Sequence, residues 1–294
     1  MRLELADLVR EINRSLGEYL PAASPIAQPM IDAMRHAVLG GGKRLRPQLA
    51  CATCQAFGTP FEHAMRAACA LEFIHCYSLV HDDLPAMDND ELRHGLPSAH
   101  VAFGEANAIL AGDSLHSLAF QTIAASEWHS AELKLSMIEL LAEAAGWAGM
   151  AGGQCLDIAA EGSTLSLSEL QVLHGAKTGA LIRVAVQLGA LSSARTGIND
   201  EQFLLLTEYG NRIGLAFQIM DDVLDVTATS EQLGKPAGSD EGLDKSTFPK
   251  LMGLEQANAM AHSLVEEALA FLARSRLDAY LLTSLARLVV ERKH

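Results

Sequence analysis

The sequence predicts an all-α protein, built as a single large helical bundle. Apolar residues recur at helical spacing along nearly the whole chain of 294 residues, while strict alternation of apolar and polar residues is absent. Hydrophobic residues make up 49% of the chain and charged residues 20%, which is enough material for a buried core. No stretch has the composition of a domain linker, so we expect residues 1–294 to form one domain.

The breaks between the expected helices are marked by Gly, Pro and small polar residues. The first helix is predicted by helical spacing of Leu5, Leu8, Ile12 and Leu16. Breaks follow at 21–29, 40–42, 58–60, 95–97, 162–164 and 196–199, giving about ten segments. Segments 105–126 and 168–192 are apolar over much of their circumference, as in helices surrounded by other helices. The irregular segment 228–249 is rich in Gly, Asp and Lys, and we expect a mobile loop there that acts as a lid.

The charge balance and the cysteines restrict the partners and the compartment. A formal net charge of -14 argues against nucleic acid or an anionic membrane surface as the main partner, because both would repel the chain. The five cysteines are scattered, and Cys51 and Cys54 form a lone CxxC in a helical stretch, so we expect packing cysteines and no zinc. With no signal peptide and no apolar run long enough to span a membrane, we expect a cytoplasmic protein without membrane insertion.

The first of two acidic clusters is HDDLPAMDND at 81–90, which contains Asp82, Asp83 and Asp88. Pro85 removes a backbone donor, so the helix must end or bulge there. On an unbroken helix Asp82 and Asp88 would lie ~120° apart, but a bulge can bring both carboxylates toward one hard cation such as magnesium. Taken alone, the cluster also fits a solvated helix end.

The second acidic cluster, FQIMDDVLD at 217–225, is not interrupted by Gly or Pro. On a helix its polar residues fall within an arc of about 100°: Gln218, Asp221, Asp222 and Asp225. Adjacent carboxylates in an apolar helix repel each other, so a cation is expected beside them. If the two clusters face each other, they can bind several magnesium ions and clamp a diphosphate between them.

A basic segment, GGGKRLRP at 40–47, stands out in this acidic chain. Lys43 and Arg46 combine a point charge with a planar fork for phosphate oxygens, which is typical of an anion site. The glycine-rich turn matches neither phosphate-loop pattern, and a basic helix start on the surface is the alternative. Further cations occur at Arg93, His94, Lys177 and Lys235, and His75 lies two helical turns before Asp82.

Together these segments resemble the trans-isoprenyl diphosphate synthases, most closely the bacterial farnesyl diphosphate synthases. The resemblance runs from about Ala33 to the carboxyl end, through GGGKRLRP, FIHCYSLVHDDLPAMD, LRHGLPSAH, AGDSL, GGQCLDI, HGAKTGALI, FQIMDDVLDV, LGKPAGSD and DKSTFPKL. The resemblance implies an all-α fold around a deep central cavity, usually as a homodimer. It also implies Mg²⁺-dependent, head-to-tail condensation of isopentenyl diphosphate with dimethylallyl and geranyl diphosphate.

The same resemblance implies a role for individual residues. Asp82, Asp88 and Asp221 correspond to magnesium ligands, supported by Asp83, Asp222 and Asp225. The residues around the allylic substrate are matched by Arg93, Lys177, Gln218 and Lys235, and those around isopentenyl diphosphate by Lys43, Arg46, His75 and His94. Thr178 corresponds to the residue that, with Lys177, faces the forming allylic cation. Gln154 and Asp157 fit either a supporting role or a structural helix pair.

Two positions bear on the substrate and the product. The family usually has arginine where this chain has His94, and a mostly neutral imidazole lacks the bidentate fork, so we expect weaker affinity for isopentenyl diphosphate. Tyr77 matches the bulky residue that closes the cavity in bacterial farnesyl synthases, with Ser78 beside it, and this favours the fifteen-carbon product. A core tyrosine is the alternative, as is a geranylgeranyl diphosphate synthase with a twenty-carbon product.

Two further functions fit a helical protein with aspartate clusters. A terpene cyclase would use the clusters but has less need of a second cationic pocket, which 40–47 and His75 provide here. A non-catalytic subunit of a prenyltransferase would be expected to lose its aspartates, and both clusters are intact. The sequence therefore favours the head-to-tail enzyme.

Overall fold

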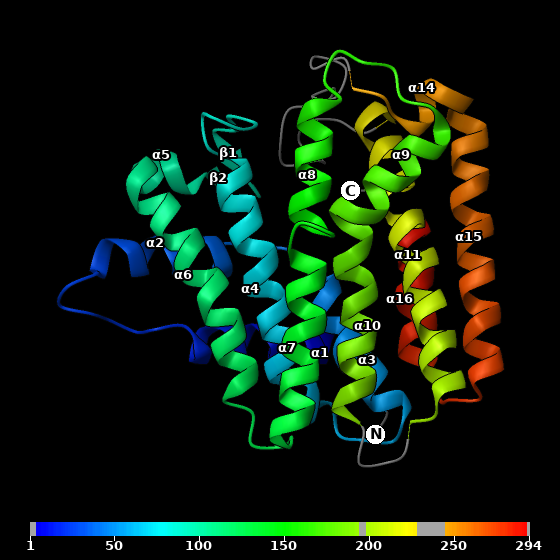
Figure 1. The fold of residues 1–294 in the computed structure, drawn as a ribbon, viewed down its shortest axis with the longest axis horizontal. Helices are drawn as coiled ribbons and strands as arrows, with labels where there is room; N and C mark the ends of the chain where they lie inside the picture. Colours follow the sequence, from blue (N-terminus) through cyan, green and yellow to red (C-terminus); the bar gives the residue numbers. More distant parts are fainter. Residues whose placement is uncertain (1–3, 194–197, 228–244, 293–294) are drawn as a thin grey trace.

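The protein is a bundle of helices, as predicted (Figure 1). The computed structural model describes residues 4–193, 198–227 and 245–292. Its helices are α1 (Leu5–Tyr19), α2 (Gln28–Leu39), α3 (Leu45–Ala56), α4 (Met65–Asp82), α5 (Ala99–Phe103), α6 (Glu105–Ala124), α7 (Ala131–Ala145), α8 (Met150–Ala159), α9 (Leu167–His174), α10 (Ala180–Ser192), α11 (Asp200–Thr227), α14 (Phe248–Met252), α15 (Leu254–Ser275) and α16 (Tyr280–Glu291). A 3₁₀ turn spans Phe61–Ala64 and a π-helical turn spans Gly175–Gly179.

The helices α3, α4, α10 and α11 form the centre of the bundle. α10 packs on both α3 and α11, while α6 covers α4 on one side and α15 covers α11 on the other (Figure 1). Buried side chains occur all around α10, which explains its nearly unbroken apolar sequence. The contact with α3 is close: a Cβ on Gly189 would lie 2.2 Å from the carbonyl oxygen of Ala50. Cys51 and Cys54 are buried on α3 within this core.

Two local features differ from the predicted elements. Segment 168–192 is helical throughout, as predicted, but a π-helical turn separates α9 from α10 within it. A short hairpin pairs β1 (Leu92–Arg93) with β2 (Leu96–Pro97) through His94 and Gly95, both with positive φ. Such a two-residue turn requires this backbone geometry, and its strands are too short to produce an alternating pattern. Both features carry predicted site residues.

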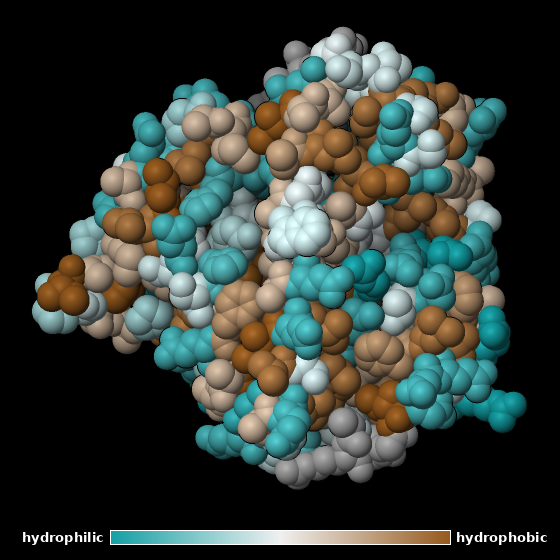
Figure 2. Space-filling view, in the orientation of Figure 1, coloured by the Kyte–Doolittle hydropathy of each residue, from teal (hydrophilic) through white to brown (hydrophobic). Residues whose placement is uncertain are grey.

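The surface is mixed. Figure 2 shows apolar and polar residues interspersed over one face, and single large apolar side chains such as Trp147, Leu135 and Val172 are exposed. Within the described ranges, we find no helix that is both long and apolar enough to cross a membrane.

Candidate active site

The first acidic cluster lies where α4 ends, as the proline predicted. α4 terminates at Asp82, and the turn after Pro85 folds back so that the N–H of Asp88 donates to the carbonyl of Asp82 at 2.8 Å. This brings the two aspartates together. Burial raises the pKa of Asp82 to about 6, with Lys177 opposing the shift and Asp88 adding to it. A carboxylate in this position favours a cation as its neighbour.

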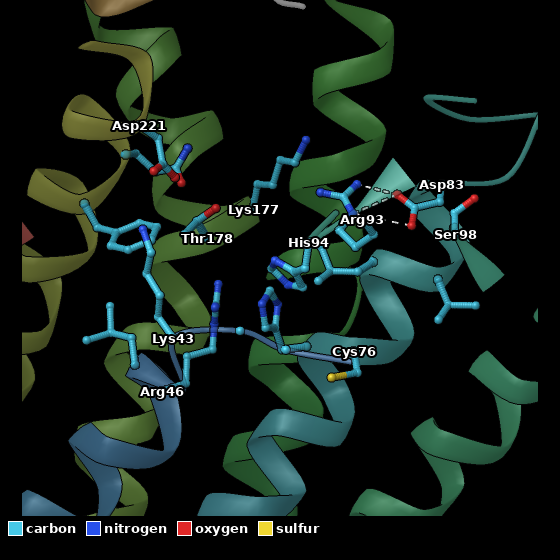
Figure 3. Close-up of a pocket in the computed structure, with 18 of the residues that line it drawn as sticks. Lys43, Arg46, Cys76, Asp83, Arg93, His94, Ser98, Lys177, Thr178 and Asp221 are labelled. Atoms are coloured by element: carbon cyan, nitrogen blue, oxygen red, sulfur yellow. Dashed lines mark hydrogen bonds and ion pairs between the residues drawn. The ribbon is translucent and has the colours of Figure 1, made fainter. Parts of the chain in front are cut away.

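The next aspartate has a different environment. Asp83 is almost fully buried and forms an ion pair with Arg93, which also reaches Asp90 at 3.3 Å (Figure 3). These contacts attach the β1–β2 hairpin to the end of α4. Asp83 was predicted to support the metal, and Arg93 to bind the allylic diphosphate. In this structure each engages the other, and Asp90 is a partner that the sequence did not identify.

The second acidic cluster forms one wall of a cavity of about 580 Å³. The predicted shared face is confirmed, because all four polar residues line this cavity: Gln218, Asp221, Asp222 and Asp225. Asp222 accepts a hydrogen bond from the backbone N–H of Phe248 at 2.9 Å, which connects α11 to the start of α14. The amide nitrogen of Gln218 lies 3.0 Å from Nδ1 of His174. Asp221 is partly exposed, whereas Asp222 and Asp225 are buried.

The basic segment lies opposite this wall. Lys43 and Arg46 line the cavity, and Figure 3 shows both pointing with His94 into the space between Asp221 and Asp83. Burial lowers the pKa of Lys43, and Arg292 lowers it further, whereas Asp221 opposes the shift. The cavity therefore holds both carboxylates and basic groups, as binding of a metal and a diphosphate requires.

Arg44, between these two cations, has a structural role. Its guanidinium forms a buried ion pair with Glu72 at 2.7 Å and donates to Asn13 and to the carbonyl of Val38. Arg44 is therefore a poor candidate for phosphate binding, because its charge is paired with Glu72, each of its three nitrogens already donates a hydrogen bond, and its side chain is buried. The sequence pattern could not distinguish it from its neighbours.

Two histidines contribute neutral rings to the cavity. Burial and the nearby Arg46 lower the pKa of His75 well below its usual value. Burial and the adjacent Arg93 lower the pKa of His94. At neutral pH both rings are uncharged, and in each ring one nitrogen donates a hydrogen bond while the other accepts one. His94 thus does not replace the charge of the arginine that is usual in the resembled family.

The π-helical turn presents Lys177 and Thr178 to the cavity. Nζ of Lys177 donates to Oδ2 of Asp157 at 2.7 Å, and Nζ of Lys245 donates to the same oxygen at 3.1 Å. Burial alone would raise the pKa of Asp157, but the two lysines hold it below its usual value. Asp157 therefore holds Lys177 at the cavity wall, and its supporting role toward a substrate stays a prediction.

A second, more apolar cavity of about 430 Å³ adjoins the first. Both cavities are lined by Arg46, His75, Leu79, Lys177 and Thr178. Other residues line only the second one: Tyr77, Ser78, Asp82, Met87, Met150, Gln154 and Ile158. A charged cavity thus leads into an apolar one, which suits a ligand with a diphosphate head and a hydrocarbon tail.

The structure also identifies residues that the sequence did not. Arg292, after the end of α16, is nearly buried, with its Nη2 at 2.7 Å from Oδ1 of Asp221 and its guanidinium 4.0 Å above the ring of Phe217. Its only sequence signal was a charge near the chain end. His174 was more accessible to prediction, since it belongs to the HGAKTG motif. Lys235 lies outside the described residues.

The carboxylates of the cavity suit a hard divalent cation, provided that a bound diphosphate supplies further ligands. Carboxylate oxygens from Asp82, Asp88 and Asp221 are the ligands that magnesium prefers. In the described part of the chain, however, no three His, Cys, Asp or Glu side chains converge to hold a metal without help. Magnesium usually keeps part of its coordination for water and substrate phosphates. The residues fit a metal whose remaining ligands come from a diphosphate.

Residues 28–279 match the family model described as polyprenyl synthetase. The chain belongs to the polyprenyl synthetase family. Among its relatives, the farnesyl diphosphate synthase of Escherichia coli is 46% identical, with 98% of each chain covered. The farnesyl diphosphate synthase of Haemophilus influenzae is 45% identical, over 99% of this chain and 98% of that one.

A solved structure of a polyprenyl synthetase relative agrees in fold over the full length. It is a geranyltransferase from Helicobacter pylori complexed with magnesium and isoprenyl diphosphate. The TM-score is 0.84 at 31% identity, with 99% of this chain and 98% of that chain covered. The resemblance found in the sequence motifs is thus confirmed at the level of the family.

Proposed function

We propose that this polyprenyl synthetase is a magnesium-dependent prenyltransferase that makes farnesyl diphosphate from isopentenyl diphosphate and dimethylallyl or geranyl diphosphate. The observation that carries the proposal is the charged cavity, with its carboxylates and its lysine and arginine side chains, opening into an apolar cavity. Two relatives that are 45–46% identical over nearly the whole chain are farnesyl diphosphate synthases, which supports this product.

On the allylic side, Asp82, Asp88 and Asp221 would hold several magnesium ions, with Asp83, Asp222 and Asp225 in support. When bound, the metal supplies positive charge that stabilises the departing diphosphate. Lys177, held by Asp157, donates to the diphosphate together with Arg93, Gln218 and Lys235. The hydroxyl of Thr178 faces the carbon from which the diphosphate leaves, where its dipole stabilises developing positive charge.

On the other side, Lys43, Arg46, His75 and His94 bind isopentenyl diphosphate. The allylic C1–O bond breaks and the double bond of isopentenyl diphosphate attacks C1 through its terminal carbon, which leaves a tertiary cation at C3 of isopentenyl diphosphate. A proton then leaves the adjacent C2, and its electron pair forms the new C2–C3 double bond. The departed diphosphate accepts this proton, so no side-chain base is assigned. Exclusion of water from the apolar cavity protects the intermediate cation from hydrolysis.

The apolar cavity sets the product length. Tyr77, with Ser78 beside it, lines this cavity and stops the growing chain at fifteen carbons. A smaller residue here would admit the twenty-carbon product of a geranylgeranyl diphosphate synthase. We further propose that residues 1–294 form one polyprenyl synthetase domain and that the protein is a homodimer.

The test is incubation with labelled isopentenyl diphosphate and either allylic starter, with and without magnesium, followed by chromatography of the dephosphorylated products. We expect magnesium-dependent farnesol, at least a hundredfold less of it from Asp221→Asn, and unchanged activity of Asp200→Asn, an exposed control at the start of the same helix. Geranylgeraniol as the product would overturn the farnesyl assignment. No elongation with either starter would overturn the head-to-tail reaction.

A further inference from the structure

His174 is a buried histidine at the junction of three elements beside the charged cavity. It is the last residue of α9 and directly precedes the π-helical turn, which carries Lys177 and Thr178. Its ring stacks on Phe248 of α14, with centroids 5.6 Å apart and an interplanar angle of 23°. Its Nδ1 lies 3.0 Å from the amide nitrogen of Gln218 on α11. The imidazole thus connects the turn to the helix that carries the second acidic cluster.

The second ring nitrogen decides which tautomer the imidazole adopts. Nε2 is buried, forms no hydrogen bond within the described residues, and lies 3.8 Å from Oδ2 of Asp222, an oxygen that the backbone N–H of Phe248 holds in place. Burial lowers the pKa of His174 to about 4, so the ring is neutral at neutral pH and only one of its nitrogens carries a proton. A proton on Nε2 is attracted by the carboxylate, whereas a lone pair there would be repelled. Nε2 therefore holds the proton, and Nδ1 is a hydrogen-bond acceptor.

An acceptor at Nδ1 determines how the amide of Gln218 is turned. A side-chain amide has a donor end and an acceptor end, so its nitrogen must face Nδ1 and its oxygen must point away from the ring. Gln218 lines the charged cavity, and none of the described residues donates a hydrogen bond to this oxygen. The second N–H of the amide stays available to a diphosphate. The negative end of the amide dipole is thereby kept for the ligand space.

We infer that His174 is a positioning residue for the allylic reaction: its Nδ1 holds the Gln218 amide so that the oxygen faces the carbon from which the diphosphate leaves. The inference rests on the proposed function and adds a residue that acts only through Gln218. Positive charge develops on that carbon in the transition state, and a fixed amide oxygen stabilises it. The ground state lacks this charge, so loss of the orientation should slow condensation without weakening substrate binding.

Two substitutions separate the acceptor from the packing of the ring. His174→Phe keeps a ring against Phe248 but removes the acceptor, whereas His174→Asn loses the ring and keeps an oxygen near the position of Nδ1. For His174→Phe we expect the single-turnover rate of condensation with dimethylallyl diphosphate to fall about tenfold to a hundredfold, with Michaelis constants for both substrates within about twofold of the wild type. His174→Asn should recover most of the rate. Val172→Ala, at an exposed position of the same helix, is the matched control and should have the wild-type rate.

An equally slow His174→Asn would assign the loss to packing of the ring and overturn the inference. A wild-type rate in His174→Phe would overturn it as well.

A double-mutant cycle with Gln218→Met tests whether His174 acts through the amide. Gln218→Met should slow condensation by itself, and adding His174→Phe should cost little more, because the amide to be oriented is already gone. Losses that multiply would show that His174 acts independently of Gln218 and would overturn the inference. A wild-type rate in Gln218→Met would show that the role of this residue in the proposed function is wrong, and the inference would fall with it.

The tautomer can be tested without any substrate. In nuclear magnetic resonance spectra of protein made with isotopically labelled histidine, the nitrogen signals that His174→Phe removes report which ring nitrogen carries the proton. We expect the proton on Nε2 at neutral pH, and a proton on Nδ1 would overturn the inference. A wild-type protein that elongates neither starter, with the proton found on Nε2, would instead overturn the proposed function and leave the contact itself confirmed.

Discussion

At the scale of single residues, the buried carboxyl of Asp82 lowers the stability of the folded protein when it is charged. Its carboxyl is withdrawn from water, and its pKa in the folded protein is about 6 against a normal value of 3.8. The folded state therefore binds a proton more tightly than the unfolded state. The stabilisation from this proton is complete below the unfolded pKa and is lost as the pH rises through the folded pKa. At neutral pH the metal-free protein bears the full cost of the buried charge.

This cost predicts that Asp82→Asn is more stable than the wild type when metal is absent. The difference between 3.8 and about 6 corresponds to about 2–3 kcal/mol, so urea unfolding at pH 7.5 should show a gain of this order. At pH 4 the wild-type carboxyl is largely protonated and the gain should nearly disappear. A gain that is equal at both pH values would show that the charge of Asp82 is not its cause.

The sequence predicted which residue types form the candidate site better than it predicted the residues with which their side chains pair. It identified Lys43 and Arg46 but could not separate them from Arg44, because the difference lies in Glu72, which is 28 positions away along the chain. Arg292 escaped notice for the same reason, since its contact with Asp221 joins two distant segments. Lys177 was identified through its motif, whereas its ion pair with Asp157 depends on how α8 packs.

At the scale of elements, the approach of α8 to the π-helical turn places Lys177. A Cβ on Gly153 of α8 would lie 2.3 Å from the backbone nitrogen of Lys177 and 2.5 Å from its Cα. Only glycine permits this contact, and backbone atoms cannot give way as a flexible side chain can. The contact brings Asp157, four residues further along α8, within 2.7 Å of the lysine.

Gly153→Ala should therefore displace the turn and impair catalysis while the helices remain. We expect kcat/KM for the allylic diphosphate to fall about tenfold to a hundredfold, since shifts of ~1 Å in positioning groups have effects of this size. Far-ultraviolet circular dichroism should be unchanged. The matched control is Gly175→Ala within the turn itself, where an added Cβ meets nothing within 4 Å. Equal losses in the two variants would refute the packing argument.

The elements themselves were largely predictable, with exceptions that have a common cause. α11 and α6 follow from apolar periodicity, and the end of α4 follows from Pro85. The π-helical turn was missed because it does not change the composition of the segment, only its hydrogen-bond spacing. The β1–β2 hairpin was missed because its strands have two residues each. Both features are short departures from regular α-helix, and they depend on packing between segments that are distant in the sequence.

At the scale of the whole molecule, one buried ion pair joins the first four helices. Arg44 precedes α3 and binds Glu72 of α4, Asn13 of α1 and the carbonyl of Val38 in α2. Arg44 and Glu72 are each 3% exposed. The segment that carries Lys43 and Arg46 is thereby fixed against the rest of the bundle. Loss of this pair should affect the stability of the protein and the substrate site together.

Arg44→Met should lower the free energy of unfolding by about 3–5 kcal/mol, because Glu72 would remain buried without its partner. Urea unfolding followed by circular dichroism measures this change. In the double variant with Glu72→Met, both charges are replaced by apolar side chains, and most of the stability should return.

The matched control is Arg14→Met. Arg14 pairs with Glu11 and Glu18 on the surface, where screening by water makes ion pairs weak, so the unfolding midpoint of this variant should not change. If the double variant were as unstable as Arg44→Met, packing of the arginine stem rather than the unpaired charge would explain the loss. A recovered fold with a raised Michaelis constant for isopentenyl diphosphate would show that the other contacts of Arg44, to Asn13 and Val38, are what orient Lys43 and Arg46.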